Sequence, residues 1–134
     1  MGPICSVIRV VDGDTIHVRC AGKKESIRLL RINTPERGRP GYYEATEALK
    51  ELVGKEEVQL LFESHGAAGR DRHGRLLAYV TANDHNLNVE MVRLGWTRFW
   101  TRYGEGSLSD LFHEAERKAR LNGEGLWTGA GWNK

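Results

Sequence analysis

The chain has 134 residues, of which 40% are hydrophobic and 28% are charged, with only 3 Pro. This length suits one domain with one hydrophobic core, and the composition excludes a disordered or fibrous protein. The 20 Lys and Arg against 18 Asp and Glu leave a formal net charge of +2, which is too small to identify a nucleic-acid partner by itself. We therefore expect one domain over residues 1–134, and function has to be inferred from local patterns.

No apolar run approaches the roughly 20 residues that a membrane helix needs. The first dozen residues also lack the basic start, apolar middle and small-residue cleavage site of a signal peptide. We expect a soluble protein without a membrane partner. Two compartments stay open: secreted or periplasmic if a leader preceded Met1, and cytoplasmic otherwise.

Strand patterns dominate the first part of the chain. Apolar or alternating segments predict strands at residues 4–11, 15–20, 26–32, 57–63 and 75–81. The first two strands flank a turn at Asp12-Gly13-Asp14, and the third extends this hairpin into a meander. Residues 64–74 are expected to form a polar, basic loop, and residues 83–85 a turn.

Helical spacing of apolar residues predicts three helices. They run from Tyr42 or Glu44 to Val53, from 87 to 94 and from 108 to 121. Gly54 and Gly95 are the expected terminators, and Ser107 or Ser109 is the expected N-cap of the last helix. That helix carries one apolar stripe, made of Leu108, Leu111, Phe112, Ala115 and Ala119.

The order of these elements is strand, strand, strand, helix, strand, strand, helix, helix. It predicts a mainly β protein with helices (α+β class), built as a small closed barrel with helices at its ends. The five-stranded oligonucleotide-binding (OB) barrel is one candidate.

The turn at Asp12-Gly13-Asp14-Thr15 places two carboxylates at a hairpin tip, where they could bind a hard cation such as Ca²⁺. Asp-Gly is also an ordinary hairpin turn. Arg28 lies between Ile27 and Leu29 on an apolar strand, and a guanidinium there needs an anionic partner. That partner is either a ligand or a structural ion pair with Asp14 or Glu36.

The sequence RDRHGR at residues 70–75 places three guanidinium groups in a glycine-containing turn. Such groups can hold phosphate oxygens with paired hydrogen bonds, although a charged run is often only a solvated loop.

Aromatic residues alternate with Arg98 and Arg102 near residue 100. This pattern could stack bases along a single strand, but core packing is the simpler role for Trp96 and Phe99. Trp100 and Tyr103 are the other aromatic members. Trp127 and Trp132 are expected to anchor the C-terminal segment.

Cys5 and Cys20 lie almost symmetrically about the first turn, so a cross-strand disulfide and two packed thiols are both open. The two cysteines have no metal-finger spacing, and the scattered histidines form no set with metal-ligand spacing.

Three segments together resemble the staphylococcal nuclease (thermonuclease) family. They are VVDGDT at residues 10–15, IRLLRINTPE at 27–36 and DRHGRLLAYV at 71–80. The likeness continues through NVEMVRLG at 88–95 and AERKARLNGEGLW at 115–127. It implies a five-stranded OB barrel with three helices and a Ca²⁺-dependent nuclease acting on DNA and RNA.

The resemblance also implies site residues. Arg28, Glu36 and Arg75 match the family's catalytic residues. The two guanidinium groups would stabilise charge on the phosphate, and the carboxylate would orient and deprotonate the attacking water. Arg72, His73 and Tyr103 would contact the substrate, a single-stranded or locally opened nucleic acid.

Metal ligands follow in the same way. Asp14 matches a direct Ca²⁺ ligand, Thr34 would contribute its backbone carbonyl, and Asp12 would help to shape the metal site. Asn33 stands where the family usually has Asp, which removes one negative charge. Two nucleotide-contact positions also differ, because His73 stands where Tyr is frequent and Thr101 replaces an aromatic residue.

An active nuclease is therefore the leading hypothesis, with a monomer expected because one chain can form the whole site. The alternative is a non-catalytic nucleic-acid or protein binding module on the same fold, which the substitution at Asn33 favours and the presence of Arg28, Glu36 and Arg75 disfavours. A structural Ca²⁺-binding protein would leave Arg28 and the basic turn unexplained.

Overall fold

The computed structural model describes residues 2–55, 57–63 and 69–128. The strands are β1 (Ile4–Asp12), β2 (Thr15–Cys20), β3 (Lys23–Leu29), β4 (Glu57–Leu61), β5 (Gly69–Arg70), β6 (Leu76–Ala82) and β7 (His85–Asn86). The helices are α1 (Tyr42–Val53), α2 (Leu87–Arg93) and α3 (Ser109–Asn122), followed by a 3-10 turn, η1 (Gly125–Trp127). None of the helices in these ranges is long and apolar enough to cross a membrane.

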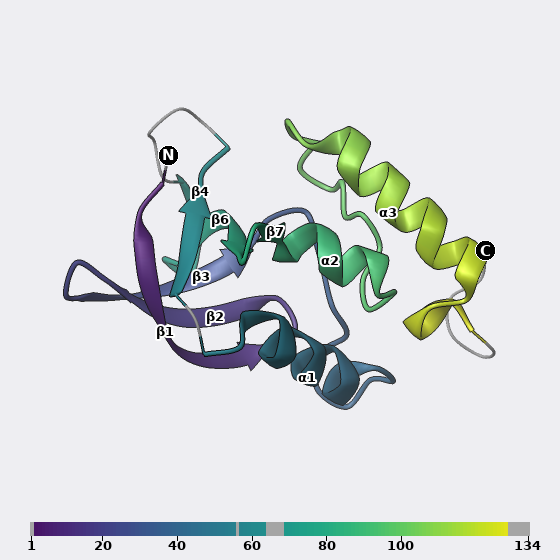
Figure 1. The fold of residues 1–134 in the computed structure, drawn as a ribbon, viewed down its shortest axis with the longest axis horizontal. Helices are drawn as coiled ribbons and strands as arrows, with labels where there is room; N and C mark the ends of the chain where they lie inside the picture. Colours follow the sequence, from purple (N-terminus) through teal and green to yellow (C-terminus); the bar gives the residue numbers. More distant parts are fainter. Residues whose placement is uncertain (1, 56, 64–68, 129–134) are drawn as a thin grey trace.

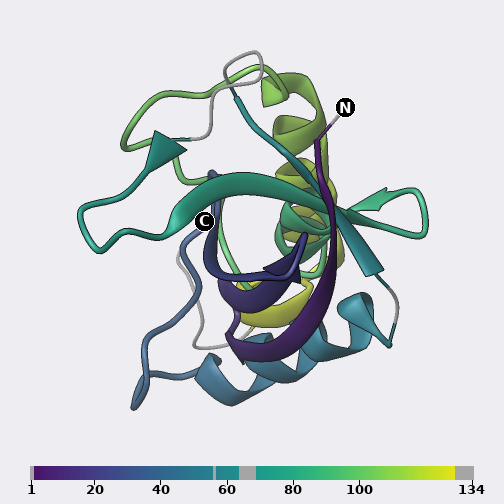
Figure 2. The same ribbon diagram turned by 90° about the vertical axis from the view of Figure 1, so that its left-hand side faces the viewer.

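Five strands close into a barrel. The meander β1–β2–β3 is antiparallel, β4 pairs with β1, and β6 pairs with β4. A parallel pairing of β3 with β6 closes the ring (Figure 2). The predicted α+β fold, a five-stranded OB barrel with three helices, is confirmed.

Apolar side chains that alternate along the strands fill the barrel. Ile16, Val18, Ile27, Leu60 and Val80 are completely buried. Helix α1 packs against β1, while α2 packs against both β6 and α3 (Figure 1). The strands and α2 thereby provide a rigid base for the loops at one end of the barrel.

Strand β3 differs from its predicted span at both ends. It begins at Lys23, because Ala21 and Gly22 both have positive φ (51° and 82°) and form a tight turn that leads directly into a hairpin. It ends at Leu29, because Arg31 adopts a φ of 66° that breaks the extended backbone. Leu30 still donates its amide to the Ala78 carbonyl at 3.0 Å.

Two short strands were not predicted. β5 and β7 have two residues each, and both pair with β6. A two-residue strand has no periodic signal, so only its pairing reveals it. Residues 64–68 of the predicted basic loop lie outside the described residues.

The three helices lie close to their predicted spans. The amide of Gly54 closes α1 by donating to the Lys50 carbonyl, and the Asn86 side chain caps α2 by accepting from the Val89 amide. The predicted serine cap of α3 is wrong: Leu108 is the N-cap, and no side chain bonds there. The Ser107 amide instead donates to Glu63 Oε2, and this contact holds the chain outside the helix.

The apolar stripe of α3 is narrower than predicted. Phe112, Ala115 and Ala119 are buried, but Leu111 is 54% exposed. Phe99 is buried as expected and stacks on Phe112 with ring centroids 4.7 Å apart. Trp127 is also buried, and Trp132 lies outside the described residues.

Cys5 and Cys20 form a disulfide, so the alternative of two packed thiols is wrong. The bond joins β1 to β2 because the neighbouring pair Ser6 and Arg19 lies in register across the hairpin. No free cysteine occurs in the described part of the chain.

Candidate active site

A cleft of about 880 Å³ lies beside the barrel, where five chain segments meet. They are the β1–β2 turn, the end of β3 with residues 30–36, Glu63 after β4, the stretch from Gly69 to Leu77, and residues 100–103. All ten of the site residues expected from the sequence line it: Asp12, Asp14, Arg28, Asn33, Thr34, Glu36, Arg72, His73, Arg75 and Tyr103. The fold thus brings together residues that are up to 91 positions apart, from Asp12 to Tyr103.

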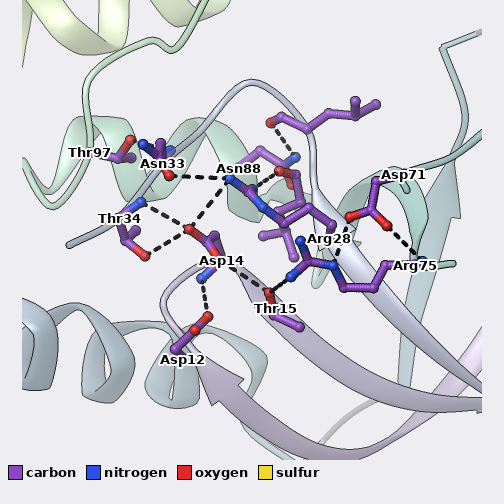
Figure 3. A network of polar contacts seen from close by, with 12 residues as sticks. Asp12, Asp14, Thr15, Arg28, Asn33, Thr34, Asp71, Arg75, Asn88 and Thr97 are labelled. Carbon is purple, nitrogen blue, oxygen red and sulfur yellow. Dashed lines mark hydrogen bonds and ion pairs between the residues drawn. The ribbon is translucent and has the colours of Figure 1, made fainter. Parts of the chain in front are cut away.

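Asp14 lies at the floor of this cleft and is only 8% exposed. Its Oδ2 accepts hydrogen bonds from the Thr34 amide at 3.0 Å and the Thr34 hydroxyl at 3.1 Å (Figure 3). A Cβ on Gly13 would lie 2.6 Å from the Thr34 hydroxyl oxygen, so the close approach requires glycine. The turn therefore fixes the carboxylate against the 33–34 segment.

Asp12 lies next to Asp14 and accepts the Asp14 amide at 3.2 Å through Oδ1. Burial raises the pKa of Asp12, and the negative charge of Asp14 raises it further. Two carboxylates in one turn repel each other, and a bound cation would reduce that repulsion.

Arg28 projects from β3 into the cleft, with its side chain 12% exposed. Nη1 donates to the Leu29 carbonyl at 2.6 Å, and Nη2 donates to Asn33 Oδ1 at 3.4 Å. Nη2 also lies 3.6 Å from Asp14 Oδ2, so Arg28 forms the ion pair with Asp14. Among the described residues, no hydrogen bond or ion pair joins Arg28 to Glu36. The guanidinium carbon lies 5.5 Å from the centre of the Trp100 ring.

Arg75 reaches the same cleft from the start of β6. Asp71 Oδ2 accepts a hydrogen bond from Arg75 Nε at 2.7 Å. Asp71 Oδ1 accepts hydrogen bonds from the backbone amides of His73 and Arg75 at 2.9 Å each. Burial acts to raise the pKa of Asp71, but these hydrogen bonds and the Arg75 charge outweigh burial and lower it. Asp71 is therefore ionised at neutral pH and fixes both the turn and the guanidinium.

A chain of polar contacts joins the two arginines. Arg75 Nη1 donates to the Thr15 hydroxyl at 3.3 Å, and that hydroxyl donates to Asp14 Oδ1 at 3.2 Å (Figure 3). Asp14 is in turn the ion-pair partner of Arg28. Both guanidinium groups are consequently held beside one buried carboxylate.

Glu36 lies on the same cleft but is exposed. Within the described residues its carboxylate has no hydrogen bond or ion pair, so both oxygens can interact with solvent or substrate. Arg72, His73 and Tyr103 are also exposed at the cleft, and Tyr103 is 74% exposed. These side chains are therefore accessible from the cleft.

The oxygen atoms around Asp14 match what a hard cation requires. The carboxylates of Asp12 and Asp14, the Asn33 amide oxygen and the Thr34 carbonyl oxygen are ligand types that Ca²⁺ prefers. No group of three or more His, Cys, Asp or Glu side chains is placed to hold a metal in the part of the chain that the structure describes. The donor set therefore fits Ca²⁺ with two acids and a neutral amide.

Sequence reasoning missed three contributors. Asp71 was read only as part of a basic turn, although its position four residues before Arg75 is a usable signal. Thr15 and Trp100 lie in patterns that the sequence showed, but no local signal predicts their contacts with Arg75 and Arg28.

Comparisons with known proteins agree with this geometry. A family model described as "Staphylococcal nuclease homologue" matches residues 26–129. The chain is 34% identical to endonuclease YncB of Bacillus subtilis over 92% of this chain and 61% of that protein. It is 32% identical to an uncharacterized endonuclease of Haemophilus influenzae, over 92% of this chain and 65% of that protein.

A third relative is the thermonuclease of Staphylococcus hyicus, at 28% identity over 91% of this chain and 74% of that protein. The chain thus spans less than two thirds of the length of the first two relatives. The family match covers most of the chain, and its named relatives are nucleases, a class of phosphodiester hydrolases. The chain belongs to the staphylococcal nuclease family.

Proposed function

We propose that this protein is a Ca²⁺-dependent nuclease that hydrolyses phosphodiester bonds of DNA and RNA by attack of water. The observation that supports it most directly is the polar chain Arg75–Thr15–Asp14–Arg28, which holds two guanidinium groups beside one carboxylate in an open cleft. The nuclease family implies a nucleic-acid substrate.

The two arginines would stabilise the negative charge that builds up on the phosphate in the transition state. A guanidinium donates paired hydrogen bonds that match phosphate oxygens. Arg28 and Arg75 are already held, by the Leu29 carbonyl and by Asp71, so little reorganisation accompanies the reaction. We assign both arginines to charge stabilisation because their guanidinium groups are already fixed in position in the cleft.

Glu36 would orient the attacking water and accept its proton. Its exposed carboxylate has no intramolecular partner within the described residues, so its oxygens are available to water. A positioned carboxylate of this kind can serve as a general base.

Asp14, Asn33 and the Thr34 carbonyl would hold the metal, and Asp12 would shape the site through its bond to the Asp14 amide. Thermonucleases are metal-dependent in general. Bound Ca²⁺ would act as a Lewis acid toward the phosphate oxygens. The all-oxygen donor set favours Ca²⁺ over softer metals.

Arg72, His73 and Tyr103 would bind the substrate on either side of the cleft. Arg72 and His73 lie on the 71–75 turn, and Tyr103 lies on the 100–103 segment of the same cleft. An exposed ring and a basic turn suit a single-stranded or locally opened nucleic acid, whose bases are free to stack. A monomer is sufficient, since one chain contributes every group.

We also propose an oxidising working compartment, either secreted or periplasmic. The disulfide between Cys5 and Cys20 supports this location, because such bonds persist mainly outside the cytoplasm.

The proposal is tested by cleavage of single-stranded DNA by the purified protein in Ca²⁺ and in chelator. Glu36→Ala is assayed beside it, with Arg117→Met as the control, because Arg117 forms an exposed ion pair with Glu114 on α3. We expect cleavage that requires Ca²⁺, disappears in Glu36→Ala and persists in Arg117→Met. Retained nucleic-acid binding without cleavage in any divalent ion would instead support the binding module.

A further inference from the structure

Arg31 has an unusual backbone conformation. Its φ of 66° lies in the left-handed region, which is costly for a side chain of this kind. The other described residues with positive φ that are not glycine, Ala21, Asn83 and Asp84, all lie in tight turns between paired strands. Arg31 instead follows β3 beside the cleft, so other contacts must hold it there.

Those contacts come from its own side chain, which is 11% exposed. Nη1 donates to the carbonyls of Tyr103 at 3.2 Å and Gly104 at 3.1 Å. Nη2 donates to Glu63 Oε1 at 3.2 Å, and Nε donates to the Tyr79 hydroxyl at 3.4 Å. One guanidinium thus joins the ends of β3 and β4, the middle of β6 and the 103–104 backbone.

Glu63 completes this cluster. It accepts the Tyr79 hydroxyl through Oε1 and the Ser107 amide at 3.1 Å through Oε2. Burial acts to raise its pKa, but the hydrogen bonds from Ser107, Tyr79 and Arg31 outweigh burial and lower the pKa to about 2. The carboxylate is therefore charged at neutral pH, as an ion pair with Arg31 requires.

The 100–107 segment packs directly on the cluster. A Cβ on Gly106 would lie 2.5 Å from Glu63 Oε1 and 2.7 Å from Arg31 Nε, so only glycine allows this approach. Contacts at Tyr103, Gly104 and Ser107 hold the segment at three points.

The same segment contributes the ring that supports Arg28. The Trp100 amide donates to the Arg31 carbonyl at 2.8 Å, and the Trp100 ring lies 5.5 Å from the Arg28 guanidinium carbon. Tyr103 packs edge-on against Trp100 with ring centroids 5.6 Å apart. A cation over an indole face is attracted to it, and the ring limits where the cation can move.

We propose that Arg31 and Glu63 are positioning residues that clamp the 100–107 segment onto the barrel, so that Trp100 holds the Arg28 guanidinium in the cleft. This inference rests on the proposed function, because it assigns Arg28 to catalysis. We call the pair the Arg31–Glu63 clamp.

The first test measures how firmly the 100–107 segment is held, and it does not depend on nuclease activity. Hydrogen–deuterium exchange is followed in Arg31→Gly and Glu63→Gln, with Arg117→Met as the control. Glycine adopts the left-handed backbone without strain, so Arg31→Gly removes the side chain and keeps the fold. We expect amides of residues 100–107 to exchange about tenfold faster in both variants, with β6 unchanged. Wild-type exchange in Arg31→Gly would overturn the clamp whatever the activity of the protein.

The second test asks whether the clamp acts through Arg28. Arg31→Gly and Trp100→Leu are each expected to lower kcat about tenfold, because a small displacement of a catalytic group is costly. In an Arg28→Ala background, both changes should have less than about a twofold effect, which a general structural defect would not reproduce.

The outcomes separate the two proposals. Faster exchange with an unchanged kcat, or an equal loss of kcat in the Arg28→Ala background, would overturn the positioning of Arg28. A wild-type protein that cleaves nothing would refute the proposed function, and the exchange measurement would still decide whether Arg31 and Glu63 hold the segment.

Discussion

At the scale of single residues, the two arginines of the cleft are held by different means. Arg28 contacts the Leu29 carbonyl, the Asn33 amide oxygen and the Asp14 carboxylate. Arg75 donates from Nε to the Asp71 carboxylate and from Nη1 to the Thr15 hydroxyl. The position of Arg28 therefore depends on several groups, one of them in the main chain, whereas Asp71 is the ion-pair partner of Arg75. Substitution of Asp71 and substitution of Arg75 should therefore lower kcat/KM by different factors.

Arg28→Ala and Arg75→Ala should each lower kcat/KM by a factor equivalent to about 2.7 to 4 kcal/mol, as expected for loss of a preorganised charge-stabilising donor. Asp71→Asn should cost less, about tenfold, because the Arg75 guanidinium remains but is less well positioned. Steady-state cleavage of a single-stranded oligonucleotide measures all three, with Arg117→Ala as the control. Near-normal rates in both arginine variants would remove these residues from the mechanism.

Asn33→Asp should tighten Ca²⁺ binding by about tenfold, because affinity at oxygen sites rises with the number of charged ligands. Asn33 Oδ1 lies at the cleft and accepts a hydrogen bond from Arg28. Titration calorimetry with Ca²⁺ gives the comparison directly. Unchanged or weaker binding would mean that the residue at position 33 is not a ligand.

At the scale of elements, α2 is tied to the barrel through one buried side chain. Asn88 is fully buried, accepts the Val80 amide at 3.0 Å and donates to the carbonyls of Leu30 and Ala78 (Figure 3). The Leu30 carbonyl and the Val80 amide lie beyond the paired residues of β3 and β6, so Asn88 supplies hydrogen bonds that this pairing does not provide. The arrangement also fixes the segment that leads to Arg31 and Asn33.

Asn88→Ala should lower the free energy of unfolding by about 3 kcal/mol, because it removes the side-chain partner of the Val80 amide and of the Leu30 carbonyl. Urea unfolding followed by circular dichroism measures the loss. Asn86→Ala is the matched comparison in the same helix: it removes only the cap to the Val89 amide and should cost about 1 kcal/mol. Equal losses in the two variants would contradict this account of Asn88.

At the scale of the whole molecule, two links between strands stabilise the barrel. The parallel pairing of β3 with β6 closes the ring, and the disulfide joins β1 to β2. The cleft lies above strands that take part in both links. Its shape therefore depends on the barrel remaining closed.

Replacing both Cys5 and Cys20 by Ala should lower the free energy of unfolding by about 3 kcal/mol, the effect expected for opening a loop of this size. The two cysteines are 15 residues apart. Urea unfolding with and without reductant gives the measurement. Reductant should destabilise the wild-type protein and leave the double variant unchanged; a wild-type protein indifferent to reductant would contradict the prediction.

Much of the fold and the membership of the cleft could be predicted from sequence. The turn at Asp12-Gly13-Asp14 and the end of α1 at Gly54 follow from local preferences that act over a few residues. The ten candidate site residues line one cleft. Their individual catalytic and ligand roles stay predictions.

Other features depend on contacts between distant residues. Nothing near Arg31 in the chain signals a positive φ, since Glu63, Tyr79 and Tyr103 hold it there from 32 to 72 positions away. The choice between a disulfide and two thiols required the register of β1 on β2. Local sequence therefore determined the helices and the main strands, because turn and periodicity preferences act over short distances, and the candidate site residues came from the family resemblance. Only the tertiary structure decided how Arg28, Arg75 and Trp100 meet, because these contacts form when the barrel closes.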